Sequence, residues 1–349
     1  MSNTSETRTF DEIVSTSLDL YMKTLTDNIF KETPAMFELK RKGCYQAASG
    51  GIQIIEPLMY GTNSTVKSYE RYETLDLTPQ EGITAALYPW AQVGGSVIID
   101  GLSEFQNAGR GQLINLVGSK LRQLEMSFQE KFAGFIFAAG KYNASQTSKD
   151  PAGLLALVSE TPDSYDVGAI DTSANTWWRN KAKGNGGSTF TWFDSSSAAA
   201  TGPVAMAQLF NYCSKGTGGT PDIILVSEKL FESYESYLAV KKALDVPMDQ
   251  EAAAYGFQNL KFRGATMYWD EQYASANVSD PASTCGAIML NSRFLRLRYA
   301  SNKNFVRTPW ITPQNQDARS CLILWYGNMT VSNRRKHGVF VDSNITDIS

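Results

Sequence analysis

The sequence lacks the residues from which most metal and redox sites are built. Its 349 residues include one histidine, His337, and four cysteines with no CxxC pair. A single imidazole cannot form a multi-histidine metal site, and the cysteine spacing excludes a zinc knuckle and a redox dithiol. We therefore predict neither a metal nor a cofactor. Buried free thiols are favoured over a disulfide, which spacing alone leaves open for Cys44, Cys213, Cys285 and Cys321.

Long hydrophobic runs are also missing. The longest, Ala133–Ala139 and Cys321–Tyr326, fall well short of the roughly 20 apolar residues that a membrane-spanning helix needs. The N-terminal sequence MSNTSETRTFDEIV has neither the basic nor the apolar region of a signal peptide. We therefore expect no membrane partner.

Charge is sparse, since charged residues make up 19% of the chain and the net charge is −3. The whole chain is thus no polycation. The hydrophobic fraction of 42% excludes a disordered chain, and the length fits one large domain or two modest ones. Two glycine-rich runs, 184–188 and 216–220, lack both the GxxxxGK[ST] spacing and the strand-to-helix context of a phosphate loop, so we interpret them as flexible loops.

His337 is the one imidazole that could act in acid–base catalysis. It follows the cations of the run Asn333–Lys336, beside a predicted turn, and no nucleophile motif lies nearby. We therefore predict a surface-loop histidine and no enzyme. A carboxylate-based enzyme is a less favoured alternative, because no pair of Asp or Glu residues stands out by its spacing.

Apolar periodicity predicts one long helix. Between Leu113 and Gly140 apolar side chains recur at steps of three and four, and such a helix would be ~42 Å long. We expect it to lie on a sheet, because the pattern is too short for a coiled coil. A shorter amphipathic helix is expected between Phe10 and Leu25, with Pro34 marking its end or a kink.

The remaining chain predicts alternating helices and strands. Further helices are expected at 152–158, 202–212 and 228–244. Strands are expected at 222–226, 287–290, 294–299, 320–330 and 338–341, a pair of strands is expected within 260–269, and a turn is expected at 332–335. Such a mixture indicates an α+β chain that contains an α/β region.

Residues 64–99 predict a long hairpin. Its first strand, Ser64–Leu77, is rich in Thr and Tyr, and a turn at 78–82 leads to a second extended run, Ile83–Ile99. A strand half buried in its own core should alternate between apolar and polar side chains, and Ser64–Leu77 does not. Because a hairpin with two polar faces buries too little apolar area to be stable alone, we expect it to lie across another molecule.

Positive charge gathers toward the C-terminus. Residues 291–340 carry nine Lys or Arg residues and one Asp. Salt bridges within or between subunits are the simpler interpretation, and a basic face toward nucleic acid or an acidic neighbour is the functional one. Specific base recognition is not expected, because no aromatic ladder accompanies the charges. The weak candidates for the basic face are Arg334, Arg335 and Lys336.

The order of these segments resembles the major capsid proteins of tailed bacteriophages, which have the Hong Kong 97-like fold. The resemblance is carried by the helical N-terminus, by the hairpin STVKSYERYETLDLTPQEGITAALYPWAQVGGSVII, by the helix at Leu113–Gly140, by PDIILVSEKLFESYESYL, LKFRGATMYWD and MLNSRFLRLRY, and by the terminal FVRTPWITPQNQDARSCLILWYGNMTVSNRRKHGVF. It implies an α+β fold with an N-arm (1–49), an extended β-hairpin loop (50–100), a peripheral domain with a spine helix and sheet (101–150), a central axial α/β domain (151–300) and closing strands (301–349).

The resemblance also implies a structural function. Such subunits assemble as pentamers and hexamers into an icosahedral shell of the virion around double-stranded DNA, and they do so in the host cytoplasm. The implied partners are further copies of the chain, a portal, scaffold or decoration proteins, and DNA bound without sequence preference. A phage tail or tube protein is the alternative. The subunit contacts expected in the hairpin are Val66, Lys67, Tyr69, Arg71, Tyr72 and Leu75.

Lys67 carries one further hypothesis from the same resemblance. Some relatives cross-link subunits through a lysine of the extended loop and an asparagine of a neighbour. Lys67 lies in the corresponding region, although a solvated charge is the simpler interpretation of a lone lysine on a polar hairpin.

Overall fold

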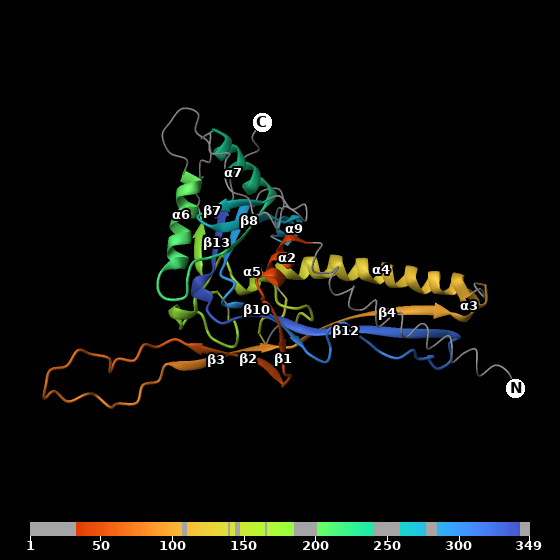
Figure 1. The fold of residues 1–349 in the computed structure, drawn as a ribbon, viewed down its shortest axis with the longest axis horizontal. Coiled ribbons are helices and arrows are strands. Elements are labelled where there is room, and N and C mark those ends of the chain that lie inside the picture. Colours follow the sequence, from red (N-terminus) through yellow and green to blue (C-terminus); the bar gives the residue numbers. More distant parts are fainter. Residues whose placement is uncertain are drawn as a thin grey trace.

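Two sheets, one long helix and a projecting hairpin make up the fold (Figure 1). The computed structural model describes residues 33–106, 110–138, 140–143, 147–164, 166–184, 201–240, 259–276 and 285–342. The helix expected at 10–25 lies outside these residues. In Figure 1 the hairpin projects to one side, and the long helix and its strands extend to the other.

The first sheet is organised around its longest strand, β12 (Ala318–Val331). Its order is β1 (Tyr45–Ala48), β10 (Leu295–Ala300), β12 and β11 (Val306–Arg307), and β4 (Ala91–Asp100) also pairs with β12. The N-terminal part of β12 pairs antiparallel with β4, and its C-terminal part pairs antiparallel with β10. This one strand therefore connects the long-helix side of the molecule to the rest.

The long helix α4 (Arg110–Phe137) lies on β4, as the apolar spacing predicts. Its buried stripe includes Val117, Leu121, Phe128 and Phe132, and the Phe132 ring meets the Trp325 ring of β12 edge-on at 4.9 Å. Close approach needs a glycine in the strand: a Cβ at Gly95 would lie 2.5 Å from a Leu124 methyl carbon. Helix and sheet are thus fitted to each other in detail.

The second sheet has six strands and two helices on one face. Its order is β5 (Lys181–Gly184), β13 (Gly338–Asp342), β9 (Cys285–Leu290), β6 (Ile223–Val226), β8 (Ala265–Trp269) and β7 (Asn259–Phe262). Helices α6 (Thr201–Ser214) and α7 (Glu228–Val240) cover the face formed by alternate strand residues such as Ile224 and Val226. Ile223 and Leu225 point to the other face and join the larger core, which explains the unbroken apolar run.

The remaining elements are short. They are α2 (Pro34–Arg41), β2 (Gln53–Met59), β3 (Ile83–Pro89), α3 (Gly101–Gln106), α5 (Leu154–Leu157), η1 (Thr176–Trp178), α9 (Glu271–Ala276) and η2 (Arg334–Lys336). Pro34 begins α2, and whether it also ends the expected preceding helix is not tested, because that helix lies outside the described residues. Its fixed φ and missing N–H suit the first turn, where the N–H has no partner within the helix.

The predicted hairpin is correct in place and wrong in pairing. Ile83–Pro89 pairs antiparallel with Gln53–Met59, and not with Ser64–Leu77, which has no strand. The expected second strand is also two strands, β3 and β4, separated at Trp90. The strands that pair are those with alternating burial, such as β2, whereas 64–77 has no apolar face to bury. We call β2, β3 and residues 60–82 between them the arm.

The other expected elements are confirmed with small shifts at their ends. The predicted helices at 152–158 and 202–212 correspond to α5 and α6. The strand pair predicted within 260–269 is confirmed as the hairpin β7–β8, and the strand predicted at 320–330 is β12. Cys44, Cys213 and Cys321 are buried and free, as expected, and the side chain of Cys285 lies outside the description.

Candidate assembly surface

The tip of the arm, residues 60–82, is exposed to solvent along most of its length. Val66, Tyr72 and Leu77 are 82%, 92% and 92% exposed, although each has a large apolar side chain. All six residues expected at subunit contacts, Val66, Lys67, Tyr69, Arg71, Tyr72 and Leu75, are exposed. The structure thus brings these six together on one projection and gives them no core of their own. Whether they touch another subunit stays a prediction.

Local contacts hold the tip in shape. The Lys67 ammonium lies 2.6 Å from Glu73 Oε1. The hydrogen bond from Lys67 and one from the Glu70 amide lower the pKa of Glu73. Asp76 accepts hydrogen bonds from the amide and hydroxyl of Thr78, which lower its pKa and form a turn. These bonds join residues that are close in sequence, so they order the tip without tying it to the rest of the protomer.

The base of the arm is fixed by a buried ion pair that sequence reasoning missed. Glu56 of β2 is 5% exposed, and its Oε1 accepts hydrogen bonds from Arg298 Nε at 2.7 Å and from the Thr330 hydroxyl at 3.0 Å. The Tyr60 ring stacks on Trp177, with centroids 4.9 Å apart. A glutamate within an apolar strand was the only signal in the sequence. These contacts tie the base of the arm to the sheet of β10 and β12 and to η1.

The outward face of the β2–β3 ribbon is apolar. The register pairs Ile55 with Leu87 and Met59 with Ile83 on that face. Ile55, Met59 and Ile83 are 63%, 83% and 76% exposed. A contiguous apolar face on a two-stranded ribbon marks an interaction surface, because such a ribbon is only marginally stable when one face stays in water.

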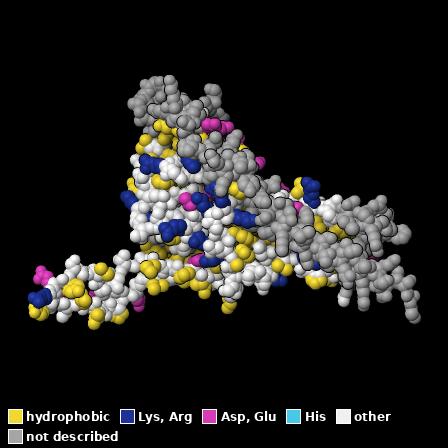
Figure 2. All heavy atoms as spheres, viewed as in Figure 1, with side chains coloured by type: hydrophobic (Ala, Val, Ile, Leu, Met, Phe, Trp, Pro, Cys, Tyr) yellow, Lys and Arg dark blue, Asp and Glu magenta, His cyan; other side chains and the backbone are white. Residues whose placement is uncertain are grey.

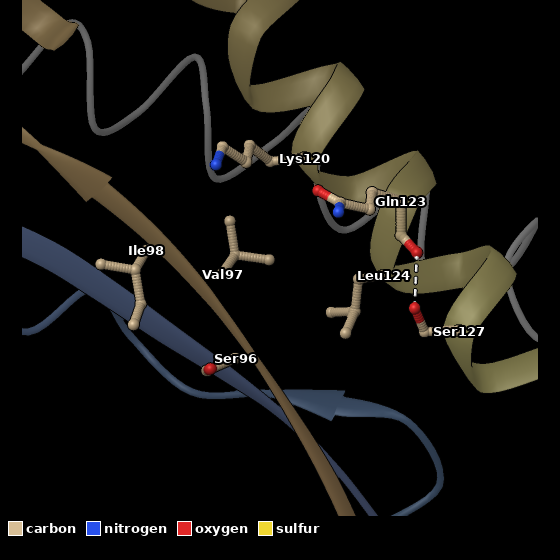
Figure 3. Close-up of a pocket in the computed structure, with 7 residues that line it drawn as sticks. All are labelled: Ser96, Val97, Ile98, Lys120, Gln123, Leu124 and Ser127. Carbon is tan, nitrogen blue, oxygen red and sulfur yellow. Dashed lines mark hydrogen bonds between the residues drawn. The ribbon is translucent and has the colours of Figure 1, made fainter. Parts of the chain in front are cut away.

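A shallow groove of about 310 Å³ lies between β4 and α4 (Figure 3). Figure 3 shows β4 side chains on one side and α4 side chains on the other, and the Ser127 hydroxyl donates a hydrogen bond to the Gln123 carbonyl oxygen at 3.0 Å. Its lining has one titratable group, Lys120, so it offers no acid–base pair for catalysis. The lining residues are Ser96, Val97, Ile98, Lys120, Gln123, Leu124 and Ser127.

Two of the three basic candidates near the C-terminus are wrong. Arg334 is fully buried, and it donates to the Leu157 and Trp178 carbonyl oxygens and to Asn180 Oδ1. Lys336 is 3% exposed, and its ammonium donates to main-chain oxygens that include those of Lys215 and Gly216. Neither can face DNA from inside the protomer. Arg335 alone of the three is exposed.

The surface position predicted for His337 is also wrong. The imidazole is fully buried, and Nδ1 accepts a hydrogen bond from the Asn291 amide at 3.3 Å. Burial and the nearby Arg334 guanidinium lower its pKa to about 3. The ring is therefore neutral at ordinary pH. It packs into the core where β13 begins and forms no part of a catalytic pair.

The glycine-rich run 216–220 has a structural role. Lys336 Nζ donates to the carbonyl oxygens of Gly216 and Gly219, and the Asn291 side chain donates to those of Gly218 and Thr220. Gly216, Gly218 and Gly219 have positive φ, which turns these carbonyl groups inward. The loop therefore surrounds a lysine ammonium, and its oxygen-lined interior does not suit a phosphate.

The described residues contain no cluster of three His, Cys, Asp or Glu side chains that could hold a metal ion. Within those same residues, no helix is long and apolar enough to cross a membrane.

The fold matches that of solved phage capsid and encapsulin subunits. No protein-family model matches the chain, and no curated protein is similar to it in sequence. The capsid subunit of cyanophage A-1(L) superposes with a TM-score of 0.58 at 13% identity, covering 87% of this chain and 90% of that one. A subunit of the holo-SrpI encapsulin complex from Synechococcus elongatus PCC 7942 has a TM-score of 0.53 at 11% identity, covering 87% and 86%. The chain has the Hong Kong 97-like capsid fold.

Proposed function

We propose that this chain is the major capsid protein of a tailed bacteriophage and that it assembles as pentamers and hexamers into an icosahedral shell around double-stranded DNA. Further copies of the chain are its main partners, and the virion is its final location. A portal and scaffold or decoration proteins complete the assembly. The proposal includes the division of the chain into N-arm, extended loop, peripheral domain, axial domain and closing strands, with boundaries at 49, 100, 150 and 300.

The arm is the observation that carries the proposal. Its tip exposes Val66, Tyr72 and Leu77, and its ribbon exposes Ile55 and Met59, while its base is fixed by Glu56 and Arg298. Large apolar side chains held away from their own core are suited to binding another molecule. In a closed shell each copy offers the same arm and the same receiving surface, so many modest contacts act together.

Electron microscopy of the purified full-length protein tests the proposal. Shells or rings of five and six subunits are the expected result. Tubes or fibres would support the tail alternative, and a protein that stays monomeric at all salt and protein concentrations would favour the carboxylate-based enzyme.

Lys67 keeps the cross-link hypothesis open to a direct test. The Lys67 side chain is exposed at the tip, and its ammonium is paired with the Glu73 carboxylate. This contact would have to break, and the ammonium would have to lose a proton, before the lysine nitrogen could attack an amide. A ladder of multimers that resist boiling on a denaturing gel would support a cross-link. A single band near 38.5 kDa would remove the hypothesis and leave the capsid proposal intact.

A further inference from the structure

A cluster of cations lies at one edge of the six-stranded sheet. Lys181 and Lys183 point to the same side of the edge strand β5, and Lys215 follows α6. Arg335 belongs to η2, next to the start of β13. None of these four cations forms an ion pair in the described part of the chain. We call Lys181, Lys183, Lys215 and Arg335 the basic cluster.

The four cations are held close together by main-chain contacts. The Lys181 amide donates to the His337 carbonyl oxygen at 3.0 Å, which places β5 beside η2. Lys336 Nζ donates to the Lys215 carbonyl oxygen at 3.1 Å, which ties the loop after α6 to the same place. Burial, then Arg335 and Lys215, lower the pKa of Lys181, so the charges act on one another. Mutual repulsion of this kind is relieved when anions approach.

The same layer carries a row of acidic residues on α7. Glu228, Glu232 and Glu235 recur at steps of four and three, so they share one side of the helix, and all three are exposed. The opposite side of α7, with Leu230, Phe231 and Tyr234, packs on the sheet. None of the three carboxylates forms an ion pair among the described residues. Like charges at these spacings destabilise a helix that is left alone.

The two charged surfaces form no ion pair with each other in the described part of one protomer. Helix α6 packs on β5 and β13, at the basic edge, whereas α7 packs on β9 and β8, farther from that edge. Figure 2 shows Lys and Arg side chains on the flank where α6 and β13 lie. In a ring, each subunit presents two different surfaces to its two neighbours, so surfaces that fail to meet in one copy can meet between copies.

We propose that the basic cluster of one copy binds the acidic side of α7 on the next copy, around each ring of subunits. This inference rests on the proposed function for its ring geometry, and it names a contact distinct from the arm. Opposite charges across such a contact set its orientation and speed its formation. The contact weakens as salt rises, because exposed pairs are screened within about 10 Å at 0.1 M.

Charge reversal with rescue tests the contact in the full-length protein. Two double variants, Lys181→Glu with Arg335→Glu and Glu232→Lys with Glu235→Lys, are each expected to lower the oligomer fraction in analytical ultracentrifugation at least tenfold. The quadruple variant, which swaps both surfaces, is expected to regain more than half of the unaltered protein's fraction. Lys261→Glu, a half-exposed charge on β7 at the opposite edge of the same sheet, is the matched control and should assemble normally. Circular dichroism checks that every variant is folded.

The outcomes separate this contact from the proposed function. Oligomers that depend on the swap but never close into shells would support the contact and contradict the capsid proposal. Normal shells from both double variants would overturn the contact and keep the capsid proposal. If the Lys181→Glu, Arg335→Glu shells form normally but lose DNA, the cluster binds nucleic acid and the contact is overturned. Folded double variants without rescue in the quadruple variant, or an unaltered protein that is always monomeric, would also overturn it.

Discussion

The arm tip and the segment 332–337 are both polar and charged in sequence, yet the protomer treats them in opposite ways. At the tip, charged and aromatic side chains stay in water, and the contacts are local, such as that between Lys67 and Glu73. In 332–337, Arg334, Lys336 and His337 are buried and bond to main-chain groups far away in sequence. A charged segment can therefore be either an exposed surface or a buried part of the core. The two cases differ in whether main-chain carbonyl groups from distant parts of the chain lie close enough to accept hydrogen bonds from the charged side chains.

Removing the Arg334 guanidinium should have the largest effect on stability. Arg334→Met keeps most of the side-chain volume but leaves the Leu157 carbonyl oxygen and Asn180 Oδ1 without their buried donor. We expect a loss of about 3–5 kcal/mol in the free energy of unfolding, as for other buried charged groups whose partners are left unpaired. Urea titration followed by circular dichroism measures it. Arg335→Met, at the exposed neighbouring position, should change stability by less than about 0.5 kcal/mol.

Removing the Lys336 ammonium should lower the free energy of unfolding by a smaller amount. Lys336→Met removes the donor that holds the carbonyl oxygens of Lys215, Gly216 and Gly219, which lie at the rim of the fold and can turn toward water. We expect a loss of about 1–3 kcal/mol. Hydrogen exchange should show faster exchange in 214–220 with little change in β12. The exposed Lys215→Met serves as the control, and an equal loss there would contradict the role given to Lys336.

The burial of the basic segment and the strand pairing of the arm could not be predicted from the sequence, because both depend on contacts between residues that are distant in the chain. The helix Arg110–Phe137 was predictable, since its apolar stripe is a local pattern. The pairing of Gln53–Met59 with Ile83–Pro89 spans the whole arm tip, and no local signal identifies that partner. Arg334 bonds to residues more than 150 positions earlier in the chain. Exposure of the tip was predictable from its lack of alternation, whereas burial of the basic segment was not.

The titration of the one histidine, His337, tests whether the segment 332–337 is buried. The pKa of His337 is lowered to about 3 in the folded protein, below its ordinary value in an unfolded chain. Its contribution to stability is therefore fully present above about pH 6.5 and is lost as the pH falls toward 3. In the unassembled folded protein, the single imidazole NMR signal should not shift between pH 8 and pH 5. A titration centred near pH 6.5 would mean that His337 is exposed and would contradict the burial of the segment 332–337.

The arm tip should show the reverse pattern, with no effect on stability and a large effect on assembly. Tyr72→Ser with Leu77→Ser removes two side chains that are each 92% exposed and lie outside the core of the protomer. The free energy of unfolding should therefore change by less than about 0.5 kcal/mol. The yield of shells should fall severalfold, because every copy in a closed assembly loses the same contact. Matched substitution of exposed residues away from the arm, such as Val204→Ser on α6, should leave the yield unchanged. A variant that is destabilised as strongly as Arg334→Met would show instead that the tip packs on its own protomer, and the difference between the two regions would disappear.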